Sequence, residues 1–264
     1  MPSTTEILDG LSAIANQATG IAVAWHIVVA IALIALASGW RPSHRTARLF
    51  TGTPLVSVAA LAFAFGNLFN GWVFAASVLA LTGLAMNRDR RPVSRGPAWT
   101  RRIAVAMIAF GWLYPHFLEG HATAYLYASP VGLVPCPTLA VAIGFALLGN
   151  GLGSRVWSLT LVAVGLLYGL FGVLRLGVFL DIGLVGGAVA LAASAFRSPA
   201  AGRAWQAYRL VAAATARHEW RLTELPQVEG PRGDGVSRAV RRLWLPSRCW
   251  RPALWVSRPL TRMR

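Results

Sequence analysis

Long apolar runs separated by short polar breaks fill the chain from residue 20 to residue 196. An α-helix needs about 20 apolar residues to cross the ~30 Å hydrocarbon core of a bilayer. Most of the runs approach that length, and the breaks between them hold arginine, proline, glycine or asparagine. We therefore predict an all-α, polytopic transmembrane helix bundle of about seven spans. The predicted spans are residues 20–40, 53–68, 72–86, 103–118, 139–149, 156–174 and 178–196.

The two flanks of this bundle differ from it in composition. Residues 1–19 form a short, mildly polar segment without arginine. A secretory signal needs positive charge before its apolar core, so the first run is expected to be a retained helix. Residues 197–264 are rich in arginine, proline and tryptophan. For this tail we expect an amphipathic helix over about 199–225, followed by chain that is largely disordered or lies on the membrane surface.

The fifth run is irregular, and we predict a helix that is broken at its outer end. Residues 139–149 alone have the pattern of a clean helix, which spans about 16 Å at 1.5 Å per residue. A Pro-Cys-Pro-Thr sequence precedes them at 135–138. We expect residues 131–137 to enter the membrane in extended form. Pro137 would then occupy the first helical position and Cys136 its N-cap.

Composition supports the membrane class, and the arginine positions predict an orientation. The chain is 56% hydrophobic and 13% charged, whereas about 25% of the residues in soluble domains are charged. All 25 basic residues are arginine, which excludes sites that need a lysine, such as a P-loop or a retinal Schiff base. With the N-terminus outside, every arginine except Arg175 falls on the inner side or in the tail. The positive-inside rule then predicts an N-out, C-in protein of the bacterial inner membrane, with a cytoplasmic tail.

The same charge distribution predicts the partners. A net charge of +16 would suggest nucleic acid in a soluble protein. Here the arginines lie beside the predicted inner leaflet, so anionic lipid is the expected partner of the tail and nucleic acid is disfavoured. Cys136 and Cys249 are the two cysteines, and they fall on opposite sides of the membrane in this topology. We therefore expect no disulfide between them.

Nearly all the unusual polar residues near a span fall on the predicted outer side. Ionisable groups are costly in a membrane and mark either function or a paired structural contact. We therefore predict an outward-facing polar cavity between helix ends. We expect Arg175 and Asp181 to form an ion pair that ties the last hairpin, with proton or substrate coupling as the alternative, and we expect His26 to make a hydrogen-bonded helix contact. The candidate residues are His26, His116, Glu119, His121, Cys136, Arg175 and Asp181.

Four of these candidates offer the donor atoms of a metal site. His116, Glu119, His121 and Cys136 supply nitrogen, oxygen and sulfur donors, which suit zinc or another transition metal. The spacing H-x-x-E-x-H is not an established metal motif, and ordinary interfacial polar residues are the alternative. A haem bound by His26 and His116 fits their expected depth but is less favoured. No grouping resembles a hydrolase triad, so an enzyme is not the preferred hypothesis.

The Pro-Cys-Pro-Thr sequence is the most specific of these signals. A helix N-terminus inside a membrane presents free N–H groups and a positive dipole end, as in the broken helices of transporters. The same dipole would favour a thiolate at Cys136, whereas a rigid turn with Cys136 as an apolar filler is the structural alternative. The preferred hypothesis is a transporter-like or permease-like protein for a small solute. A membrane metal or redox protein and a structural or assembly subunit with a protein partner remain alternatives.

Four short elements also occur in a recognisable order. Tyr114-Pro115, Gly120-His121, the Pro-Cys-Pro-Thr sequence at 135–138 and the Asp-Ile-Gly-Leu sequence at 181–184 follow one another. In these elements the chain resembles a family of uncharacterised bacterial multi-pass membrane proteins. The resemblance covers residues from about 20 to 196 and is most specific between 111 and 149. It implies a membrane bundle and supplies no activity.

Overall fold

A computed structural model describes residues 3–85, 90–119 and 121–197, and the expected tail helix at 199–225 lies outside them. Within these ranges the chain folds into nine α-helices and three short 3₁₀ helices without a sheet, which confirms the all-α prediction. The 3₁₀ helices are η1 (Ala122–Ala124), η2 (Asn150–Gly153) and η3 (Phe179–Asp181). The α-helices are α1 (Thr4–Gln17), α2 (Thr19–Ala37), α3 (His44–Ala64), α4 (Leu68–Ala85), α5 (Ala98–Leu113), α6 (Tyr125–Ala128), α7 (Pro135–Leu148), α8 (Arg155–Arg175) and α9 (Ile182–Arg197).

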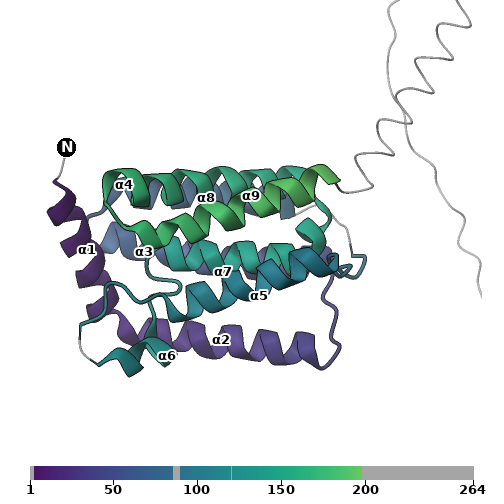
Figure 1. The fold of residues 1–264 in the computed structure, drawn as a ribbon, viewed down its shortest axis with the longest axis horizontal. Coiled ribbons are helices and arrows are strands. Elements are labelled where there is room, and N and C mark those ends of the chain that lie inside the picture. Colours follow the sequence, from purple (N-terminus) through teal and green to yellow (C-terminus); the bar gives the residue numbers. More distant parts are fainter. Residues whose placement is uncertain (1–2, 86–89, 120, 198–264) are drawn as a thin grey trace, which may run out of the picture. The chain divides into compact units, whose positions relative to one another are not determined.

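The longer helices form a bundle with two chemically different ends. Figure 1 shows the longer helices with their axes roughly parallel to one another, and α1 crosses one end of them. These longer helices are α2, α3, α4, α5, α7, α8 and α9. We call the end with α1, α6 and the η3 turn the distal end. The opposite end holds Arg41, Arg95 and Arg155, and we call it the basic end.

Five segments are long and apolar enough to cross a membrane. They are α2, α3, α4, α8 and the continuous segment Phe179–Arg197, which joins η3 to α9. Large apolar side chains on these helices are exposed, among them Ile34 at 68% and Leu79 at 74%. Faces of this kind are stable against lipid, not water. The helix composition is therefore that of a polytopic membrane protein, and its apolar faces contact a bilayer.

Helix α7 is the centre of the bundle. Of its 14 residues, 12 are buried. Six of them pack in one core with residues of α3, α4, α5, α8 and α9, namely Leu139, Ala140, Ala142, Ile143, Ala146 and Leu147. The helix is about 21 Å long at 1.5 Å per residue, whereas the 21 residues of α8 span about 32 Å. Cys136 lies beside Asp181 at the distal end, and the Leu148 carbonyl accepts from the Gly96 N–H at the basic end, at 3.0 Å. A short helix suffices because its ends meet protein, not lipid.

The predicted entry into α7 is wrong in two respects. The helix begins at Pro135, so Val134 is its N-cap and Cys136 already lies in the first turn. Residues 130–134 form a buried turn, not an extended segment, and the Val134 N–H donates to the Pro130 carbonyl at 3.2 Å. Pro135 and Pro137 have no N–H, so they remove two donors that a buried helix start would otherwise leave unpaired.

Thr138 closes this buried turn. Its hydroxyl accepts from the Gly132 N–H at 2.8 Å and donates to the Val134 carbonyl at 2.7 Å. Gly132 has a φ of +76°, a conformation that glycine adopts without steric cost. The Trp25 ring occupies the space that a side chain at this position would need. The turn is therefore fixed by hydrogen bonds and by packing against α2.

Other helix boundaries also differ from the prediction, and two of them have a clear local cause. Helix α3 begins at His44, not at residue 53, because the Ser43 hydroxyl caps it by accepting from the Thr46 N–H at 3.1 Å. Helix α5 ends at Leu113, before the expected 118, since Tyr114 precedes a proline and has a φ of −43° and a ψ of 101°. Residues before proline are driven out of the helical region.

Helix α1 was not predicted as a separate element. It begins with a capping box, in which the Ser3 hydroxyl accepts from the Glu6 N–H and the Glu6 carboxylate accepts from the Ser3 N–H. These hydrogen bonds hold the pKa of Glu6 below its ordinary value. The apolar face of α1 packs through Leu11 and Ile14 onto Leu133 and Val134. Helix α1 therefore covers the start of α7.

The contact between α5 and α7 depends on a glycine. A Cβ at Gly111 would lie 2.6 Å from the Pro137 carbonyl oxygen, which belongs to the backbone and cannot move freely. We expect Gly111→Ala to lower the thermal unfolding midpoint in detergent, with a loss of about 1–3 kcal/mol from overpacking. Gly83→Ala is the matched control, since Gly83 lies in α4 and a Cβ added there would meet no atom within 4 Å. Equal midpoints for the two variants would contradict this packing.

Candidate polar site at the distal end

A buried carboxylate connects three segments at the distal end. Asp181 in η3 is 1% exposed. The Tyr114 hydroxyl, at the end of α5, donates to its Oδ1 at 2.8 Å. The Cys136 thiol, in the first turn of α7, donates to its Oδ2 at 3.1 Å. We call Tyr114, Cys136 and Asp181 the Asp181 cluster.

The turn between α8 and α9 directs Asp181 inward. Gly177 has a φ of +69°, and the Val178 N–H returns to the Gly172 carbonyl at 2.9 Å. The Asp181 carboxylate fills the space that a side chain at Gly172 would take. The missing side chain of Gly172 thus allows the carboxylate to lie against α8, where water does not reach it.

The expected ion pair between Arg175 and Asp181 is not formed. Arg175 is the last residue of α8 and donates through Nη1 to the Thr4 hydroxyl at 3.1 Å. The Thr4 hydroxyl lies 3.3 Å from the Arg175 carbonyl as well. The turn after α8 separates the two side chains, since Asp181 points into the bundle and Arg175 points to α1. Arg175 therefore ties α1 to the end of α8.

A cavity of about 270 Å³ adjoins the Asp181 cluster. Cys136 lines this cavity and Asp181 does not, so the thiol lies between the cavity and the carboxylate. Ile7 and Leu11 of α1 also line it, so α1 forms part of its wall. We call this space the distal cavity. Its polar lining residues are Asn67, Asn70, Cys136, Tyr168 and Arg175.

Two hydrogen-bonded groups shape the wall of the distal cavity. The Tyr168 hydroxyl of α8 donates to the Asn70 side-chain oxygen of α4 at 2.9 Å. Phe117 has a φ of +80°, which is strained for an aromatic residue. The Asn16 amide holds this conformation by donating to the Phe117 carbonyl at 2.9 Å, and its oxygen accepts from the Glu119 N–H at 2.9 Å.

His26 is separate from the Asp181 cluster. It is buried between α2 and α5, with Nδ1 2.9 Å from the Ala22 carbonyl and Nε2 3.2 Å from the Trp112 carbonyl. Its ring also meets the Trp112 ring edge to face, with centroids 4.6 Å apart. These contacts are those of a polar link between two helices.

The remaining candidates do not converge on one point. His116 is half-buried and packs against Phe117, with ring centroids 4.3 Å apart. Glu119 and His121 are exposed on the connector after it. Among the described residues, no three His, Cys, Asp or Glu side chains lie close enough together to hold a metal ion. The structure thus brings Cys136 and Asp181 together and places Arg175 at the same cavity. The His116 ring lies beside Tyr114 of the cluster, with centroids 6.5 Å apart, and the other three candidates lie apart.

The Asp181 cluster has a defined chemical capacity. A buried acid whose hydrogen-bond donors are a hydroxyl and a thiol can hold a proton or accept hydrogen bonds from a neutral donor. Sequence reasoning identified Cys136, Arg175 and Asp181, but it did not assign Tyr114 or Tyr168 to the site. Their signals were weak, because an isolated tyrosine in an apolar run usually belongs to the interface or the core.

Comparison with known proteins does not add to this picture. No protein-family model, curated protein or solved structure matches the chain. The geometry of the distal end therefore carries the functional argument.

The hydrogen bond from Tyr114 can be tested by removing one oxygen. Tyr114→Phe leaves Asp181 Oδ1 without its donor, and an unpaired buried polar group costs roughly 1–3 kcal/mol. We expect a lower thermal unfolding midpoint for this variant. Tyr127→Phe is the control, because Tyr127 is exposed. The double variant Tyr114→Phe, Asp181→Leu should lose less than the sum of the two single losses, since either change alone removes the same hydrogen bond. Strict additivity would argue against the cluster.

Proposed function

We propose that the protein is a transporter-like or permease-like membrane protein that binds a small solute in the distal cavity. The observation that carries this proposal is the direct contact between a residue lining that cavity, Cys136, and a buried carboxylate, Asp181. Polar groups inside a membrane bundle are costly and concentrate at substrate and ion pathways.

The lining of the distal cavity favours a particular kind of solute. Most of the wall is apolar, from Ile7, Leu11 and Phe171 among others. Arg175 and Asn67 offer hydrogen-bond donors at the same cavity. A small, partly apolar solute with one anionic or hydrogen-bond-accepting group fits this lining. The volume of about 270 Å³ lies just below the range of about 300–1,000 Å³ that is usual for ligand pockets, which favours a small solute.

Helix α7 supplies the means to couple the cavity to the rest of the bundle. Its first turn carries Cys136, and its start rests on a buried turn that α1 covers. A shift of this start would break the bond between Cys136 and Asp181 and open the carboxylate to the cavity. In transporters, the ends of discontinuous helices form substrate and ion sites.

The alternatives from the sequence remain predictions without a favouring observation. A metal or redox protein would need a third donor near Cys136 and Asp181, and an assembly subunit would need a partner. The resemblance to a bacterial membrane protein family also remains a prediction. For the topology we propose seven spans, with α5 and α7 included, the distal end outside and the basic end in the cytoplasm. The arginine distribution supports this orientation.

The proposed orientation can be tested with single cysteines. His121 is an exposed residue of the distal end and Ser94 an exposed residue of the basic end. In a chain with Cys136→Ser and Cys249→Ser, a membrane-impermeant maleimide added to intact bacterial spheroplasts should label His121→Cys and spare Ser94→Cys. Both should react after the membrane is permeabilised, which is the control for reactivity. Labelling of Ser94→Cys alone in intact spheroplasts would reverse the orientation.

Solute binding can be tested with a panel of small monocarboxylates and neutral polar solutes. We expect at least one to raise the unfolding midpoint of the purified protein and to enter proteoliposomes that contain it. Asp181→Asn should reduce this uptake at least tenfold, because it removes the buried acid to which Cys136, a residue of the cavity wall, is hydrogen-bonded. Glu119→Gln is the matched control, an exposed acid at the same end, and should keep full uptake. Unchanged uptake in Asp181→Asn would refute the role of the cluster.

A further inference from the structure

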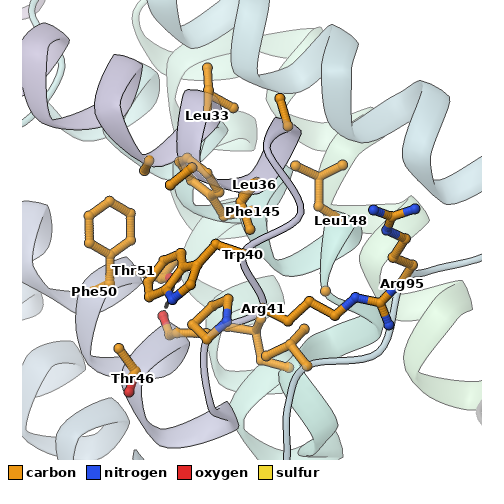
Figure 2. A pocket seen from close by; sticks show the side chains of 18 of the residues that line it. Leu33, Leu36, Trp40, Arg41, Thr46, Phe50, Thr51, Arg95, Phe145 and Leu148 are labelled. Carbon is orange, nitrogen blue, oxygen red and sulfur yellow. Dashed lines mark hydrogen bonds between the residues drawn. The ribbon is translucent and has the colours of Figure 1, made fainter.

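A second and larger cavity lies at the basic end of the bundle. Its volume is about 810 Å³, and its walls come from the last three turns of α2, the start of α3, the end of α7 and the segment 93–95. It shares no lining residue with the distal cavity within the described ranges. We call it the basic-end cavity, and Figure 2 shows its side chains.

The interior of the basic-end cavity is apolar. Leu33 and Leu36 of α2 face Phe50 of α3, and Phe145 and Leu148 of α7 complete the lining (Figure 2). Phe50 and Phe145 meet edge to face, with ring centroids 5.6 Å apart. An occupant would therefore touch the central helix of the bundle, which lipid outside the bundle does not reach.

The mouth of the basic-end cavity is positively charged. Arg41, Arg95 and Arg101 line it, and no Asp or Glu among the residues that the structure describes does so. Figure 2 shows the side chains of Arg41 and Arg95 extending to the same side of the cavity. Other arginines at this end are engaged differently, since Arg155 stacks on the Phe196 ring at 4.3 Å. Like charges that share a mouth repel one another, and an anion between them removes this cost.

From this arrangement we infer that the basic-end cavity is a binding site for an anionic glycerophospholipid of the surrounding bilayer. The headgroup phosphate lies between Arg41 and Arg95, which match its geometry as bidentate donors. An acyl chain lies along Leu33, Leu36 and Phe145. Trp40, which is 52% exposed, lines the same mouth and suits the headgroup level of a membrane.

The charge of the mouth favours an anionic lipid over two other possible occupants, the tail at residues 198–264 and a second copy of the chain. Residues 198–264 carry 13 arginines and 4 acidic residues, so this tail has the same sign as the mouth. A second copy of the chain would bring another basic end against the first. An anionic lipid is the occupant whose charge complements Arg41 and Arg95 and whose chain complements the apolar interior.

The full-length protein in nanodiscs tests the headgroup site. We expect phosphatidylglycerol to be retained in native mass spectra, and to raise the unfolding midpoint, in preference to phosphatidylcholine. Arg41→Gln with Arg95→Gln should weaken this preference roughly tenfold or more, from the loss of two arginines beside an anionic lipid. Arg90→Gln with Arg102→Gln is the matched control, because these exposed arginines of the same end do not line the cavity. Equal retention of both lipids, or an equal loss in the control, would overturn the inference.

The apolar interior is tested separately. Leu36→Trp should fill the cavity and displace the retained lipid, whereas Ile34→Trp, on the exposed face of the same helix, should not. A photoreactive benzoylphenylalanine in place of Leu33 should add the mass of a phospholipid on illumination. Cross-linking to residues 198–264 or to a second copy would instead identify a protein occupant and overturn the lipid assignment, as would full lipid retention in Leu36→Trp.

Discussion

A carboxylate buried in an apolar helix bundle needs hydrogen-bond donors, and the distal end of this protein is arranged around that need. Asp181 receives one bond from the end of α5 and one from the start of α7. Both donors stand at places where a proline interrupts the helical pattern, since Tyr114 precedes Pro115 and Cys136 lies between Pro135 and Pro137. The prolines therefore do more than end helices. They set the positions at which a hydroxyl and a thiol reach the same acid.

The central position of α7 relates the two ends of the molecule. Because 12 of its 14 residues are buried, the helix has little freedom to tilt without disturbing its neighbours. Its first turn belongs to the Asp181 cluster, and its last turns form a wall of the basic-end cavity. The two proposed sites therefore share one buried helix.

The sequence predicted the elements well and their contacts poorly, for physical reasons. Apolar runs of about 20 residues are a strong signal for membrane helices. Each predicted span corresponds to a helix of the bundle, and five of these helices are long and apolar enough to cross a membrane. The boundaries failed where local chemistry outweighs hydropathy. Ser43 caps α3 well before its apolar run begins, and Pro115 stops α5 while its apolar run continues. Helix α1 was missed because its apolar face is narrow and its other face is polar.

In the candidate site, the sequence likewise predicted which residues matter but not which of them are in contact. Cys136 and Asp181 were identified by the cost of placing such groups in a membrane, a property that composition reveals. Their bond to each other was not, since the partners lie 45 positions apart and no local pattern records such a contact. Arg175 and Asp181 are close in sequence and opposite in charge, which made an ion pair the natural expectation. The glycine turn at Gly177 overrode it, because a change in backbone direction decides which side chains meet, whatever their charges favour.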